Sequence, residues 1–113
     1  MGVPRALGYA AALATVSLAP AAAGADDAGL TGNVLQNSIC TNKLACISYI
    51  RGITEGYLLG SVGKPYFCLP VGYDYTQLVD VVLLNLRNHP ERRASPASYL
   101  IVIALHEAFP CGK

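Results

Sequence analysis

Apolar residues recur at three- and four-residue spacing over most of the chain after residue 29, which is the spacing typical of amphipathic helices. The stretch GLTGNVLQNSIC, residues 29–40, holds a few such positions and predicts one short, weak helix. Residues 41–61 continue the pattern much further, and Thr41 or Asn42 is placed to cap the start. This stretch predicts a longer second helix.

Two glycines, Gly52 and Gly56, lie one turn apart inside this second helix. Each costs up to about 1 kcal/mol in a helix interior relative to alanine, so the pair indicates that another backbone approaches closely. Packing inside the monomer is the favoured interpretation. The alternative, a dimer face, is less favoured because this spacing is diagnostic of helix association mainly in membranes.

Residues 61–75 predict a loop, because two glycines, two prolines and three tyrosines in this stretch prevent any long regular element. A third helix should follow, with Asp74 as N-cap, Gln77 completing a capping box, and Asn88 as its end before Pro90. A strand also suits its β-branched run, but the cap and the length favour a helix. Its apolar residues cover more than one face, which predicts the most buried helix: Leu78, Val79, Val81, Val82, Leu83, Leu84 and Leu86.

A fourth helix is predicted with Ser95 as N-cap, Pro96 as its first residue and Pro110 marking its end. The pattern as a whole predicts an all-α fold, a small bundle of about four helices.

Residues 1–25 have a different character. They contain one arginine, an uncharged apolar run and small residues that end in Ala-x-Ala at Ala25, which is the layout of a secretory signal peptide. An uncleaved membrane anchor is the alternative, but the run is rich in alanine rather than leucine and Pro20 interrupts it. We expect cleavage after Ala25, or else after Ala23, and a mature periplasmic domain formed by residues 26–113.

Composition limits what this mature domain does. With 53% hydrophobic and 13% charged residues, the chain is too apolar for a disordered tail. Without Arg5 the domain has equal numbers of basic and acidic side chains and is formally neutral, so it has no long-range attraction for nucleic acid or an anionic membrane. We therefore expect no nucleic acid partner, and no membrane partner after signal cleavage.

All the cysteines, Cys40, Cys46, Cys68 and Cys111, lie in the mature domain, and an even number in a small exported domain predicts disulfides. The third and fourth helices, joined by a short turn, should pack antiparallel, which brings Cys68 beside Cys111. Cys40 and Cys46 then remain for each other. Because six residues of continuous helix would hold them about 9 Å apart, the helix must break near residues 41–42.

Candidate catalytic chemistry is sparse. The cysteines are expected to be oxidised, so no thiolate is available, and no set of nucleophile, base and orienting residue can be assembled. His89 and His106 are expected at opposite ends of the last two helices, which argues against a joint metal site. We therefore expect neither an enzyme nor a cofactor or metal.

Two loops remain as candidate binding surfaces. The first, SVGKPYF, carries Lys64 and Tyr66 on a segment stiffened by Pro65. The second, NHPERRAS, carries three charged candidates between two prolines: Glu91, Arg92 and Arg93. Tyrosine and arginine often anchor protein interfaces, and proline lowers the ordering cost of binding. Solvated turn residues and, for the tyrosine, a cover for the core are the alternatives.

An ordered set of motifs spans Cys40 to Cys111. It includes CISYIRGITEG with Glu55, then FCLP, a QLVDVV helix, an HPE turn and a helix that ends in FPC. This set resembles the Rap/Tai immunity proteins of type VI secretion. The short spacing of Cys40 and Cys46 and the GKPYF loop depart from the pattern of that family.

The resemblance implies a small, helical, periplasmic inhibitor, often a homodimer, that blocks a secreted peptidoglycan-cleaving amidase effector. It transfers no contact residue by position, because the effector-contacting loops of the family vary. The alternative function is a periplasmic helical structural or chaperone-like module without an effector partner.

Overall fold

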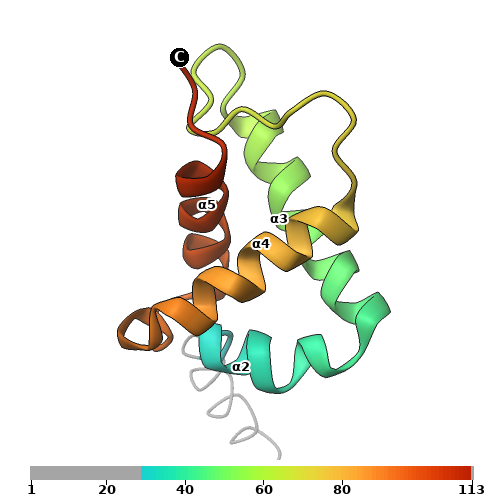
Figure 1. Ribbon diagram of the computed structural model, residues 1–113, viewed down its shortest axis with the longest axis vertical. Helices are drawn as coiled ribbons and strands as arrows, with labels where there is room; N and C mark the ends of the chain where they lie inside the picture. Colours follow the sequence, from blue (N-terminus) through green and yellow to red (C-terminus); the bar gives the residue numbers. More distant parts are fainter. Residues whose placement is uncertain (1–28, 113) are drawn as a thin grey trace, which may run out of the picture.

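The computed structural model describes residues 29–112, and within them the fold is all-α, as predicted (Figure 1). Over this described range, four α-helices and two short 3-10 helices follow one another: α2 (Gly32–Asn37), η2 (Ile39–Thr41), α3 (Lys43–Gly60), α4 (Tyr75–Asn88), η3 (Pro90–Arg92) and α5 (Ala97–Ala108). The expected signal peptide, residues 1–25, lies outside the described residues. Within the described part of the chain, no helix has the length and apolar character needed to cross a membrane.

Three helices begin at side-chain caps. The backbone N–H of Val34 donates to the hydroxyl of Thr31, that of Ala45 to Asn42 Oδ1 at 2.9 Å, and that of Gln77 to Asp74 Oδ1 at 2.8 Å. Each cap satisfies one of the N–H groups that a helix start leaves unpaired. The predicted caps at Asn42 and Asp74 are therefore confirmed.

The start of α5 differs from the prediction by one residue. Pro96, not Ser95, occupies the N-cap position, and no side chain caps this helix. Instead, the N–H of Ala97 donates to the carbonyl of Leu30 at 2.8 Å, beside a short antiparallel bridge between Thr31 and Pro96. The segment that leads into α2 thus closes the start of α5.

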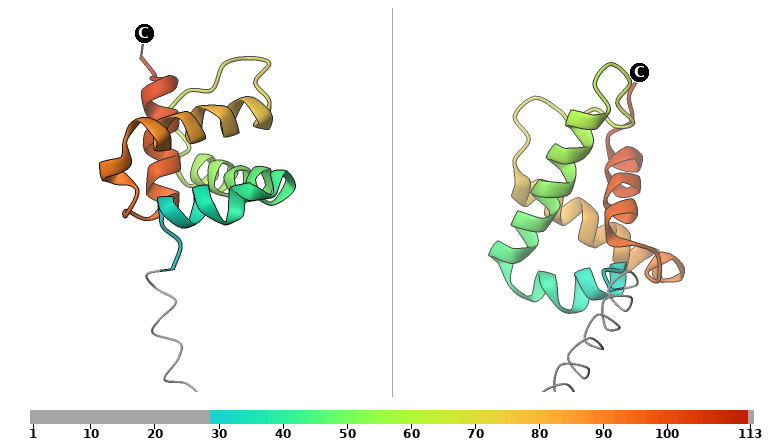
Figure 2. Two further views of the ribbon diagram at one scale, coloured as in Figure 1. Left: turned by 60° about the horizontal axis from the view of Figure 1, so that its bottom comes forward. Right: turned by 180° about the vertical axis from the view of Figure 1, so that it is seen from behind.

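Helices α3 and α5 run in the same general direction, α4 crosses them, and α2 closes the end where α5 begins (Figure 1). Figure 2 shows from two other directions that α4 crosses α5 obliquely. The predicted antiparallel packing of these two helices is therefore wrong, although they are in extensive contact. The turn that joins them, residues 89–96, changes the chain direction sharply.

Helix α5 contributes more buried residues to the core than any other element does. Five of its residues are buried, namely Ala97, Leu100, Ile101, Ala104 and Leu105, whereas α4 contributes Leu78, Val82 and Leu86. The prediction that the third helix is the most buried is therefore wrong. Helix α4 buries only one stripe because it lies across the outside of the others, and Leu84 on its outer side is 51% exposed.

Gly52 and Gly56 do not pack against another backbone. An added Cβ at either position would meet no atom within 4 Å, so the favoured interpretation of close packing within the monomer is wrong. The close approach occurs at Gly32, where a Cβ would lie 2.6 Å from Leu100 Cδ1 and 3.1 Å from the carbonyl oxygen of Arg93. A side chain at position 32 would displace the Leu100 side chain and press on the Arg93 backbone, so glycine suits this close contact.

Both predicted disulfides are present. Cys40 and Cys46 pair across a break in the helix at Asn42, whose backbone is extended, and their Cα atoms are 4.4 Å apart. Cys68 pairs with Cys111. This second pairing does not need antiparallel helices, because the loop after α3 first returns to the end of α5 and then crosses over to the start of α4 (Figure 1).

Candidate partner-binding surface

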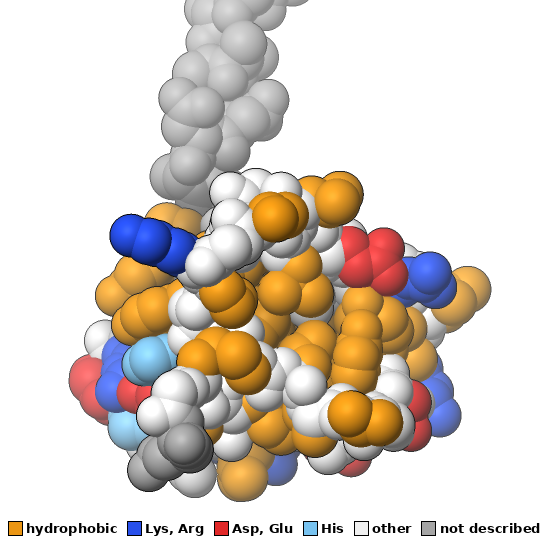
Figure 3. Space-filling model, turned by 90° about the horizontal axis from the view of Figure 1, so that it is seen from above, with side chains coloured by type: hydrophobic (Ala, Val, Ile, Leu, Met, Phe, Trp, Pro, Cys, Tyr) orange, Lys and Arg blue, Asp and Glu red, His pale blue; other side chains and the backbone are white. Residues whose placement is uncertain are grey.

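Exposed apolar side chains lie at the end of α3 and along the loop that follows it. Leu59 is 79% exposed, Val62 84%, Tyr66 42% and Val71 fully exposed. We call these four residues together with Lys64 the end surface. Figure 3 looks onto this end of the molecule, where hydrophobic side chains cover much of the visible face and charged side chains lie toward its edges. Apolar patches of this kind mark interaction sites more often than isolated exposed residues do.

The loop that forms the end surface is held at several points. Phe67 is fully buried and its ring stacks on Tyr57 at a centroid distance of 5.2 Å. The backbone N–H of Cys68 donates to the carbonyl of Phe109 at 2.8 Å, next to the disulfide with Cys111. These contacts fix the loop to both α3 and α5, so it is a braced segment rather than a free connection.

His106 braces Tyr66. The two rings stack nearly parallel with centroids 3.8 Å apart, and Nδ1 of His106 lies 2.6 Å from the carbonyl oxygen of Tyr66. Because a carbonyl only accepts, Nδ1 donates and carries the hydrogen. The ring of His106 thus positions the predicted binding residue Tyr66.

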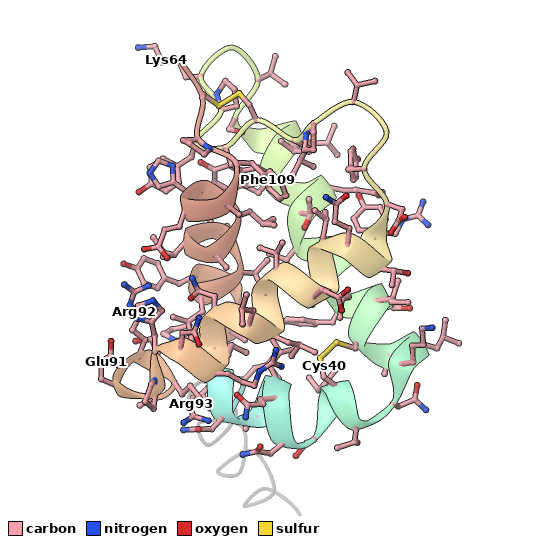
Figure 4. All side chains as sticks on the ribbon, viewed as in Figure 1. Cys40, Lys64, Glu91, Arg92, Arg93 and Phe109 are labelled. Atoms are coloured by element: carbon pink, nitrogen blue, oxygen red, sulfur yellow. A yellow bond between two sulfur atoms is a disulfide. The ribbon has the colours of Figure 1, made fainter. Side chains whose placement is uncertain are left out.

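The second candidate loop is the η3 turn, which lies away from Lys64 (Figure 4). Within it, Arg92 Nη1 is 3.3 Å from both carboxylate oxygens of Glu107, and the side-chain amide of Asn85 donates to the same carboxylate at 2.7 Å. The hydrogen bond from Asn85, followed by that from Arg92, lowers the pKa of Glu107. Arg92 is thus engaged within the protein, with a third of its side chain exposed.

Arg93 and Glu91 differ in how free they are. Arg93 Nη1 donates to Gln36 at 3.3 Å, its carbonyl accepts from the N–H of Asn33, and its Nε is buried without a partner. Glu91 is two-thirds exposed, 3.2 Å from His89 Nδ1, and its pKa is lowered by a backbone hydrogen bond and then by His89. Arg93 therefore joins the turn to α2, while Glu91 faces solvent.

The predicted binding residues form two groups that α5 connects. Tyr66 contacts His106 and Arg92 contacts Glu107, and these two contacted residues are consecutive in α5. The two histidines make separate contacts, and residues 29–112 contain no group of three or more side chains suited to a metal ion.

A further cluster, which the sequence analysis did not find, joins α3 to the start of α4. Arg51 Nε donates to Glu55 at 2.9 Å, the hydroxyl of Tyr75 donates to the same carboxylate at 3.0 Å, and the guanidinium of Arg51 lies 5.5 Å from the centre of the Tyr75 ring. Partial burial raises the pKa of Tyr75, and the hydrogen bond from Arg51 lowers that of Glu55. The four-residue spacing of Arg51 and Glu55 was the available signal.

Comparison of the chain with known protein families finds one match. The sequence pattern of the Rap1a immunity protein family matches residues 31–111, from the N-cap of α2 to the last cysteine. No curated protein and no solved structure matches the chain. The match covers every helix described above.

Proposed function

Because the chain belongs to the Rap1a immunity protein family, whose members are not enzymes and inhibit amidase effectors of type VI secretion, we propose that it binds a cell-wall amidase through its end surface. The family supplies the class of partner. The exposed, braced end surface is the observation that carries the proposed binding site. An inhibitor of this kind acts by covering its partner and needs no reacting groups of its own.

The composition of the end surface supports this role. It combines apolar side chains with one aromatic residue and one cation, and residues 59–72 contain no charged side chain other than Lys64. Tyrosine is enriched among interface anchors, and a loop that is already ordered loses little conformational entropy on binding. We propose that Tyr66 is the anchor and that Lys64 faces an acidic group of the amidase.

The η3 turn contributes in a lesser way to the proposed interface. Glu91 is two-thirds exposed beside His89 and can still reach a partner, whereas Arg92 would act while paired with Glu107. Arg93, which is bound to Gln36, supports the turn. These assignments predict larger losses of affinity for changes in the end surface than for changes in the turn.

We propose that the protein acts in the periplasm, to which residues 1–25 direct it as a signal peptide that is then cleaved. The two disulfides fit an oxidising compartment, and the N-terminal pattern supports export. We also propose that the protein forms a homodimer. The exposed Gly52 and Gly56 leave one side of α3 open to close approach by another helix.

The function is tested by directing a genomically linked amidase to the periplasm with and without this protein. We expect lysis with the amidase alone and protection when the two are co-expressed. Absence of protection, together with absence of a complex with any linked hydrolase, would favour the alternative of a structural or chaperone-like module.

A further inference from the structure

A cleft of about 310 Å³ lies between the η2–α3 segment and α4. It is lined by Cys40, Thr41, Lys43, Cys46 and Ile47 on one side and by Thr76, Val79, Asp80 and Leu83 on the other. Figure 4 labels Cys40 here and Lys64 toward the opposite end of the molecule, so the cleft is separate from the end surface. Its volume is near the lower limit of pockets that hold small molecules.

Each wall of this cleft carries one charged side chain, of opposite sign to the other, and the remaining lining is largely apolar. Lys43 belongs to α3 and Asp80 to α4, and Ile47, Val79 and Leu83 are half-buried apolar residues near them. Neither charged side chain makes an ion pair or hydrogen bond with another described residue.

The other described carboxylates are all engaged. Glu55, Glu91 and Glu107 have cationic or histidine partners, and Asp74 caps α4. Among residues 29–112, Asp80 is therefore the one carboxylate that has no hydrogen-bond or ion-pair partner in that range. It shares its cleft with the equally unpaired Lys43.

We propose that this cleft binds a short zwitterionic peptide with an apolar side chain. The peptide carboxylate pairs with Lys43 on one wall, the ammonium group pairs with Asp80 on the other, and the apolar side chain covers Val79 and Leu83. The hydroxyl of Thr76, one turn before Asp80, offers a further hydrogen bond to the ammonium end. This binding activity is independent of the proposed inhibition of an amidase and uses none of its residues.

The proposal is tested with the dipeptide alanyl-leucine titrated into the ¹⁵N-labelled mature protein. We expect saturable shifts of amide signals from residues 40–47 and 76–83, with a Kd on the order of 1 mM. Lys43→Gln and Asp80→Asn should each weaken binding about five- to tenfold, as expected for loss of a charge-assisted contact. The matched controls Lys64→Gln and Glu91→Gln should leave the Kd unchanged.

The wild-type protein gives a second readout that does not depend on variants. N-acetyl-alanyl-leucine amide has the same side chains without the two charges, and it should bind at least about tenfold more weakly. Equal binding of both peptides would overturn the proposal and would identify the cleft as a purely apolar contact site. Shifts confined to other residues, or no saturable shift with either peptide, would also overturn it.

Discussion

The imidazole of His106 stacks on the ring of Tyr66 and its Nδ1 donates to the carbonyl of the same residue at 2.6 Å. One side chain of α5 thereby fixes both the ring and the backbone of the proposed anchor. The loop around Tyr66 is therefore ordered by the domain itself, before any partner binds.

His106→Ala should weaken binding of the amidase by about fivefold or more while lowering the free energy of unfolding by only about 1 kcal/mol. Without the stack the loop would become ordered only on association, and the conformational entropy lost at that step would reduce the affinity. His106→Phe keeps the stack and loses the donor, so its affinity should fall between those of wild type and His106→Ala. Calorimetric titration and urea unfolding measure the two effects; an unchanged affinity for His106→Ala would show that the stack does not position the anchor.

Gly52→Ala should raise the free energy of unfolding by about 0.5–1 kcal/mol, because the added methyl group meets no atom within 4 Å and alanine is the better helix former. Gly32→Ala should lower it by at least about 1 kcal/mol, because the new Cβ would lie 2.6 Å from Leu100 Cδ1. Urea unfolding of the two variants makes a matched comparison. Loss of stability in Gly52→Ala would indicate that another chain packs on this side of α3.

The two disulfides should contribute unequally to stability. The Cys68–Cys111 link closes a loop with a sequence separation of 43 residues and the Cys40–Cys46 link one of 6. On the chain-entropy relation, replacing the first pair by alanines costs about 4 kcal/mol and replacing the second about 2 kcal/mol. Equal losses in chemical unfolding of the two double variants would mean that native contacts, rather than loop closure, determine what each disulfide contributes.

Acid should destabilise the protein through its glutamates. The pKa values of Glu55, Glu91 and Glu107 are lowered from the ordinary 4.5, so their stabilisation is complete above that pH and is lost as the pH falls through the folded-state values. Glu107→Gln should therefore be less stable than wild type at pH 7, with the difference shrinking below pH 4.5. Thermal unfolding across this range tests the sign, and a difference that grew on acidification would contradict it.

Local signals predicted most of the helices. Asn42 and Asp74 were recognisable as caps because a cap depends on a residue and its next three neighbours. Both disulfides were also predicted correctly, although the antiparallel packing used to pair Cys68 with Cys111 does not occur. The loop after α3, rather than the packing of the two helices, brings Cys68 next to Cys111.

What could not be predicted depends on how the helices cross. Burial of α5 rather than α4 and the close approach at Gly32 both follow from packing between distant segments. The same holds for the site. The contact of Tyr66 with His106 spans 40 residues and that of Arg93 with Gln36 spans 57, so the sequence showed exposed loops without showing which side chains were already engaged.

The central claim is that the end surface binds the amidase, and the most direct test is the Kd of the purified complex for two matched leucine variants. Leu59 and Leu44 both lie on α3 and are 79% and 73% exposed, but only Leu59 belongs to the end surface. We predict that Leu59→Ala and Tyr66→Ala each weaken binding by more than about 1 kcal/mol, roughly fivefold, while Leu44→Ala leaves the Kd unchanged. Unchanged affinity for Leu59→Ala and Tyr66→Ala in a complex that still forms would contradict the claim.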